Sequence, residues 1–110
     1  MGQLIYGSTG TVVEIDDRAL AHLKVVMITK LRRSEGFAFS WDEELANGSG
    51  RSTVWVHPSV SLHFKFYGTR QPAMNKLWLE ELMASANSSG GLHMLPEHDR
   101  TTENEVPPIY

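Results

Sequence analysis

The sequence predicts one small α+β domain in which two helices pack against a small antiparallel sheet. The chain has 110 residues and is 41% hydrophobic, which is enough for one modest core. Two stretches carry apolar residues at helical spacing, and five shorter stretches are rich in β-branched and aromatic residues. The expected order is ββαβββα with a further strand at the end, and the single domain is expected over residues 1–95.

The first two strands are expected at residues 3–7 and 11–15. They flank the tetrapeptide Gly7-Ser8-Thr9-Gly10, and two β-prone runs on either side of a Gly-bounded turn indicate a hairpin. A phosphate-binding loop would need a lysine and a helix immediately after it, and neither is present here. The hairpin turn is therefore the favoured interpretation.

The first helix is expected over residues 18–33, with Asp16 or Asp17 as its N-cap. Leucine and methionine side chains recur at helical spacing and predict its buried stripe: Leu20, Leu23, Met27 and Leu31. Cationic and imidazole side chains are expected on the opposite, solvated side: Arg18, His22, Arg32 and Arg33. Gly36 is expected to end the helix.

Three further strands are expected at residues 37–41, 52–57 and 60–67. The last of these has the clearest alternation of apolar and polar residues in the chain, which is typical of a half-buried strand. Between the first two, residues 42–50 begin acidic and end in Asn47-Gly48-Ser49-Gly50, a composition that predicts a flexible loop.

The second helix is expected over residues 73–86, because Met74, Trp78 and Leu82 follow one another at intervals of four. Residues 92–95 are expected to add an edge strand. Residues 96–110 are polar, acidic and proline-bearing, which predicts a disordered tail.

The charge is unevenly distributed between the domain and the tail. Residues 1–95 carry nine Lys and Arg against nine Asp and Glu, whereas the last fifteen residues carry four acidic side chains against Arg100 alone. A neutral domain lacks the strongly basic character that would make nucleic-acid binding the default interpretation.

Several classes of function find no support in the sequence. The chain has no cysteine, so it offers no disulfide, thiolate nucleophile or cysteine-based zinc site. None of its five histidines forms the helical pairing with a carboxylate that marks a zinc motif, so we expect no metal and no cofactor. We find no Gly-x-Ser-x-Gly motif, no long apolar span and no signal peptide, which favours a non-catalytic protein of the cytoplasm without membrane partners.

Cationic residues and one aromatic form the main candidate site. On the strand predicted over 60–67, His63, Lys65 and Tyr67 share the face away from the core. The candidate nucleic-acid or anion site comprises Arg32, Arg33, Arg51, His63, Lys65, Tyr67 and Arg70. The cations would hold phosphates and Tyr67 would stack on a base. The alternative to a binding site is that these residues simply form the solvent-exposed side of a sheet, which is the more frequent explanation of such a face.

The tryptophan content indicates a second candidate surface. Trp41, Trp55 and Trp78 are a large set for so small a domain, and most of this aromatic surface is expected in the core. An outward-facing Trp41 or Trp55 would favour a protein partner or a homodimer.

Several segments resemble those of a protein family, although none of them is a motif with a known chemical role. They are residues 2–8, 16–23, 30–33, 39–41 and 50–52, Trp55, residues 58–59 and 64–65, and residues 82–88. Over most of residues 1–96 the chain thereby resembles a family of small uncharacterised actinobacterial proteins that are often labelled ATP-dependent DNA ligase. Adenylating ligases use the lysine of a Lys-x-Asp-Gly motif, and none of the four lysines here begins one.

Three hypotheses follow for the function. The first is a small non-catalytic binding module, a nucleic-acid-associated accessory protein whose partner is nucleic acid or another protein. The second is a protein–protein interaction or homodimeric structural module. The third, implied by the label of the family that the chain resembles, is an enzyme related to ATP-dependent DNA ligases.

Overall fold

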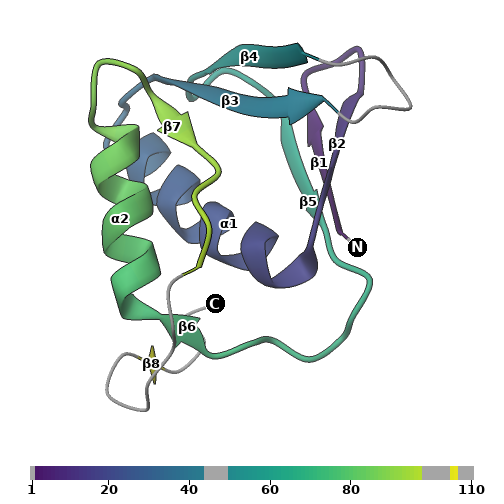
Figure 1. Ribbon diagram of the computed structural model, residues 1–110. Helices are drawn as coiled ribbons and strands as arrows, with labels where there is room; N and C mark the ends of the chain where they lie inside the picture. The colour runs from purple at the N-terminus through teal and green to yellow at the C-terminus, as the bar shows by residue number, and fades with distance from the viewer. Residues whose placement is uncertain (1, 44–49, 98–104, 107–110) are drawn as a thin grey trace.

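The computed structural model describes residues 2–43, 50–97 and 105–106 (Figure 1). The elements follow one another as β1 (Gly2–Tyr6), β2 (Thr11–Ile15), α1 (Asp17–Arg32), β3 (Phe37–Glu43), β4 (Gly50–Val56), β5 (Leu62–Lys65), β6 (Met74–Asn75), α2 (Lys76–Ala86), β7 (Leu92–His93) and β8 (Glu105–Val106). This confirms the α+β class and the predicted order of the main elements. The two-residue strands β6 and β8 were not expected from the sequence.

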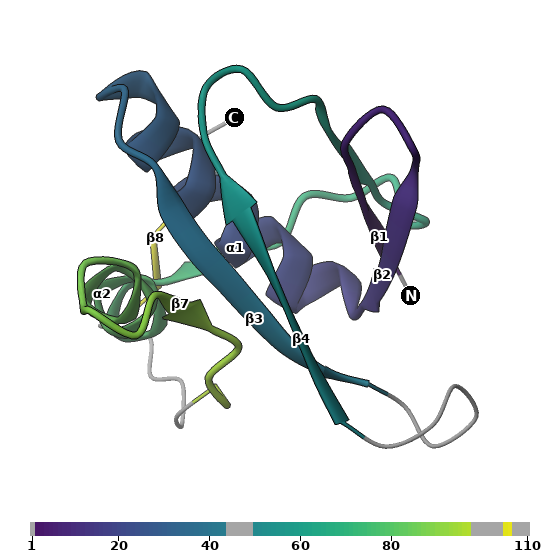
Figure 2. The ribbon, with the colours of Figure 1, turned by 90° about the horizontal axis from the view of Figure 1, so that it is seen from above.

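The strands divide among three small sheets. The strand orders are β2-β1-β5, β4-β3-β7 and β6-β8, and among the described strands only β7 joins its neighbour, β3, in parallel. Seen from above, β3 and β4 pass over α1, while β1 and β2 stand beside the beginning of that helix (Figure 2). The hydroxyl of Tyr6 donates a hydrogen bond to the carbonyl oxygen of Trp55 and thereby links the first sheet to the second.

Helix α1 lies at the centre of the core. Leu20, Leu23 and Met27 are fully buried, as their spacing predicted. They meet buried side chains of both three-stranded sheets and of α2: Leu4, Val13, Phe39, Val56, Trp78, Leu82 and Leu92. A core shared in this way fixes both sheets against one helix.

Two carboxylates set the start of α1 and the end of β5. The Asp16 side chain accepts a hydrogen bond from the amide of Ala19 at 3.2 Å, so Asp16 is the N-cap. The Asp17 carboxylate instead accepts from the amides of Tyr67 and of Gly68, the latter at 2.8 Å. The backbone after Lys65 therefore bonds to a side chain, and the strand is shorter than the 60–67 expected.

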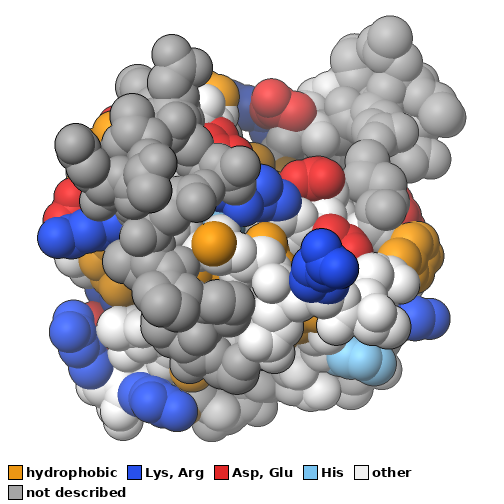
Figure 3. Space-filling view, turned by 90° about the horizontal axis from the view of Figure 1, so that it is seen from below, with side chains coloured by type: hydrophobic (Ala, Val, Ile, Leu, Met, Phe, Trp, Pro, Cys, Tyr) orange, Lys and Arg blue, Asp and Glu red, His pale blue; other side chains and the backbone are white. Residues whose placement is uncertain are grey.

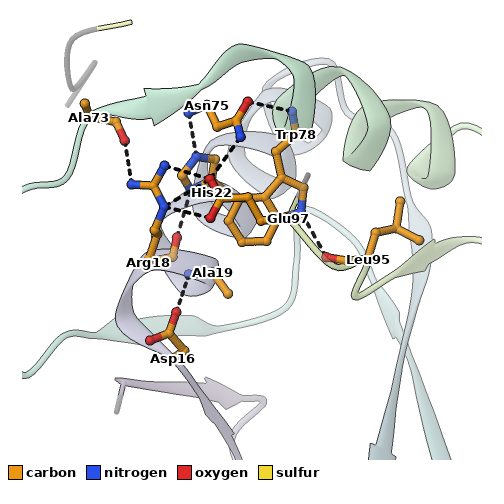
Figure 4. A network of polar contacts seen from close by, with 9 residues as sticks. All are labelled: Asp16, Arg18, Ala19, His22, Ala73, Asn75, Trp78, Leu95 and Glu97. Atoms are coloured by element: carbon orange, nitrogen blue, oxygen red, sulfur yellow. Dashed lines mark hydrogen bonds and ion pairs between the residues drawn. The ribbon is translucent and has the colours of Figure 1, made fainter. Parts of the chain in front are cut away.

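The expectation of a solvated His22 is wrong. His22 is fully buried: its Nδ1 lies 2.8 Å from the carbonyl oxygen of Arg18 and its Nε2 2.8 Å from the amide nitrogen of Asn75 (Figure 4). Helical periodicity missed this because α1 is covered on more than one side, so its buried surface is wider than the apolar stripe.

Arg18, expected beside His22 on the solvated side, is also engaged. Its guanidinium donates to the Glu97 carboxylate at 2.8 and 2.9 Å and to the carbonyl oxygen of Ala73 at 3.0 Å. Glu97 lies within the segment predicted to be a disordered tail, and β8 pairs with β6. The rest of that predicted tail, and most of the predicted 42–50 loop, lie outside the described residues.

Candidate functional site

The outer face of β5 brings three of the predicted site residues together. In the pairing of β1 with β5, Ile5 lies opposite His63 and Gln3 lies opposite Lys65, so these four side chains share one face of the sheet. His63 and Lys65 are exposed. Tyr67 follows with 56% of its surface exposed, and the Lys65 ammonium lies 6.0 Å from the centre of its ring. The ring of Tyr67 is therefore open to solvent and has a positive charge beside it.

A small groove adjoins this face where the chain leaves β5 and passes along α1. Its cavity has a volume of about 200 Å³ and is lined by Asp17, Lys24, Phe66 and residues 68–72. The Lys24 ammonium lies 5.8 Å from the centre of the Phe66 ring, and Arg70 also lines the groove. The groove thus pairs an aromatic ring with two cations that come from different elements.

The remaining predicted cations lie elsewhere. Arg32 and Arg33 are exposed at the far end of α1, and a helix of 16 residues is ~24 Å long at about 1.5 Å per residue. Arg51 belongs to β4 in the second sheet, opposite Asp42 of β3. Seen from below, Lys and Arg side chains form separate spots without one continuous patch (Figure 3). The structure therefore gathers His63, Lys65 and Tyr67 at β5, places Arg70 in the adjoining groove, and leaves Arg32, Arg33 and Arg51 apart.

Lys24 and Phe66 also belong to this region, although neither was among the residues predicted for the site. Phe66 alternates with Lys65 and Tyr67 in sequence, and in the structure it is half-buried, packs against the core and also lines the groove. Lys24 lies seven residues after Asp17, which places both on one side of α1, and this spacing was a usable signal.

The side chains at this site are of kinds that suit noncovalent contacts. Ammonium and guanidinium groups attract phosphate, and exposed aromatic rings stack on planar groups. Among residues 2–43 and 50–97, no three histidine or carboxylate side chains lie close enough together to hold a metal ion. Within the same part of the chain, no helix is both long and apolar enough to cross a membrane.

The comparison with protein families gives a match over nearly the whole described chain. Residues 1–97 match the family DUF7882, described as a domain of unknown function. The chain belongs to the DUF7882 family. The match extends past β7 to Glu97, so the DUF7882 domain includes the carboxylate that Arg18 binds. No curated protein and no solved structure matches the chain.

Proposed function

We propose that this DUF7882 domain is a non-catalytic module that binds single-stranded nucleic acid. The binding surface consists of His63, Lys65, Tyr67 and Arg70, together with Lys24 of the adjoining groove. One observation carries the proposal: an exposed aromatic ring with a lysine ammonium 6.0 Å from its centre. The groove that Lys24 and Arg70 line follows directly along the chain.

The geometry favours a single strand over a duplex. Bases of a single strand are free to stack on an exposed ring, and each stacked base contributes about 1–3 kcal/mol. Lys65, Arg70 and Lys24 would contact successive phosphates. Three such contacts on a single strand give an expected slope of about −2 for the logarithm of the affinity against the logarithm of the salt concentration.

The test is fluorescence anisotropy with a labelled single-stranded oligonucleotide at low and moderate salt. We expect saturable binding that weakens as salt rises, and the double variant K65Q/R70Q to bind about tenfold more weakly. Tyr67→Leu is expected to weaken binding at least as much, because it removes the stacking ring.

Lys76→Gln is the matched control, because Lys76 is exposed at the beginning of α2 and lies outside the proposed surface. It removes one positive charge and should leave the affinity within about twofold of wild type. If K76Q weakened nucleic-acid binding as much as the variants of the proposed site, the loss of affinity would be an effect of net charge, and the proposed site would be contradicted.

A second candidate function, the interaction or homodimeric module, is favoured by Trp55. Its side chain is 59% exposed on the outer face of β4, which makes it the most exposed of the large hydrophobic side chains in the described residues. Its indole covers Gly36, where an added Cβ would lie 2.6 Å from the ring atom Cζ2. Such a fixed, exposed indole is a suitable anchor for a protein partner.

Sedimentation equilibrium at increasing protein concentration distinguishes this candidate. A homodimer formed through Trp55 would show a mass that rises with concentration in wild type, and Trp55→Thr would shift the protein to monomer. A wild-type mass that stays monomeric at every concentration excludes the homodimer.

A further inference from the structure

The side of the first sheet that faces away from the core carries a regular arrangement of side chains. In the sheet β2-β1-β5, residues 3–6 of β1 each lie between one residue of β2 and one of β5. Leu4 and Val13 are buried, so the residues on either side of them point outward. These strands stand at one side of the molecule (Figure 1 and Figure 2). Two rows of side chains cross the outward side, and we call them the first-sheet face: Val12, Ile5 and His63 in one row, and Glu14, Gln3 and Lys65 in the other.

The second of these rows has opposite charges at its two ends. Glu14 belongs to one edge strand, β2, and Lys65 to the other, β5, and both side chains are exposed. Gln3 stands between them and donates a hydrogen bond to Oε2 of Glu14 at 2.7 Å, which uses only one of the two carboxylate oxygens. Neighbouring strands are about 4.8 Å apart, so the two charged residues are separated by about 10 Å of sheet. Neither forms an ion pair with another described residue.

The first row supplies apolar surface. Val12 has 47% of its surface exposed, and it lies opposite the half-buried Ile5 of the central strand. Val12 and Tyr67, which follows β5, are two of the three large hydrophobic side chains that are exposed in the described residues. Covering such side chains with another surface removes them from water and is favourable. The first-sheet face thus combines apolar surface with one exposed charge of each sign.

This arrangement of charges is complementary to itself. Stacked sheets lie about 10 Å apart, and a twofold axis parallel to β1 lays β2 of one copy over β5 of the other. Each Glu14 then meets the partner subunit's Lys65, and the two Ile5 side chains meet at the axis. A twofold axis across the strands would instead lay β2 over β2 and β5 over β5, where no acidic side chain of the face meets a basic one. The charges therefore select the first arrangement.

We propose that the first-sheet face binds a second copy of the chain and forms a symmetric homodimer with two Glu14–Lys65 ion pairs on either side of an Ile5 contact. Three short strands offer a small face, and small interfaces are weak, so we expect a dissociation constant on the order of 100 µM. This interface is separate from the one that Trp55 would form, because Trp55 belongs to β4 of the second sheet.

The first-sheet face shares His63 and Lys65 with the proposed nucleic-acid surface. Where both proposals hold, nucleic acid and a second copy compete for Lys65, and this consequence alone rests on the proposed function. Glu14 separates the two proposals, because it belongs to the dimer contact and not to the nucleic-acid surface. E14K should therefore disrupt the dimer without weakening the binding of an oligonucleotide, so either proposal can fail while the other stands.

The experiment measures self-association of the full chain by sedimentation equilibrium from micromolar to millimolar concentration. We expect E14K and K65E each to weaken the dimer at least about tenfold, because each replaces two attractive charge pairs by two repulsive ones. The double variant E14K/K65E exchanges the two charges and should restore the dissociation constant to within about threefold of wild type. Amide chemical shifts that change with protein concentration should fall on residues 3–5, 12–14 and 63–65.

Two charge reversals on α2 are matched controls, because Glu80→Lys changes the net charge as E14K does and Lys76→Glu changes it as K65E does. Both residues are exposed and lie outside the first-sheet face. These controls and W55T should leave the dissociation constant within about twofold of wild type. A wild-type mass that stays monomeric, a double variant as weak as the single ones, or equal weakening by the controls would each overturn the proposal. So would loss of association in W55T with no effect in E14K, since this would assign the dimer to Trp55.

Discussion

At the scale of single residues, His22 shows how one buried polar side chain connects distant parts of the chain. Its Nδ1 is bonded to the Arg18 carbonyl one turn earlier in α1, and its Nε2 accepts from the amide of Asn75 at the start of α2. The ring also lies 4.5 Å from the ring of Trp78, measured between centroids. Both nitrogens are thus engaged, which defines a neutral ring with its proton on Nδ1.

Replacing His22 by alanine should therefore be costly. We expect H22A to lower the free energy of unfolding by about 3 kcal/mol, because it leaves a cavity beside Trp78 and removes the acceptor of the buried Asn75 amide. His63→Ala is the matched control: the same residue type on the exposed face of β5 should change stability by less than about 0.5 kcal/mol. Urea unfolding of both variants measures this difference. A similar effect of the two changes would contradict the importance of the His22 contacts.

At the scale of secondary structure, what the sequence could predict depended on whether the signal was local. The helix over 18–33 and the hairpin over 3–15 were predictable because spacing and turn residues lie within the segment itself. The division into two main sheets was not, since β5 pairs with β1 across most of the chain and β7 joins β3 in parallel through two residues only. Neither pairing can be predicted from the pattern of residues within the strands themselves.

The candidate site was predictable to the same degree. Alternation over residues 60–67 predicted one exposed face for His63, Lys65 and Tyr67. The structure has His63 and Lys65 on one exposed face of β5, and Tyr67 is exposed just beyond the end of this strand. The groove beside them depends on the Asp17 carboxylate turning the chain after Lys65, which is a contact between residues 50 positions apart. Another cavity is lined by residues of β2 and β3 and by Met94, and only the tertiary fold brings these together.

At the scale of the whole molecule, Glu97 holds the two helices and the end of the domain together. Its carboxylate accepts from Arg18 of α1 and, at 2.9 Å, from the Asn75 side chain that caps α2. Just before it, the carbonyl oxygen of Leu95 accepts from the Trp78 indole at 2.9 Å. The hydrogen bonds from the Arg18 guanidinium are the main reason that the pKa of Glu97 falls from 4.5 to about 2. The segment after β7 is therefore part of the folded unit.

Acid should weaken this link in a defined pH window. Because the pKa of Glu97 is lower in the folded than in the unfolded chain, its contribution is complete above about pH 5 and is lost as the pH falls from there toward 2. Partial exposure of the pair reduces the contribution, which we expect to be about 2 kcal/mol at neutral pH. Glu97→Gln should remove it at pH 7 and leave a smaller stability difference from wild type at pH 2.5. Thermal unfolding of both proteins across this range measures the difference. A constant gap between them at all pH values would mean that Glu97 acts through its shape and not through its charge.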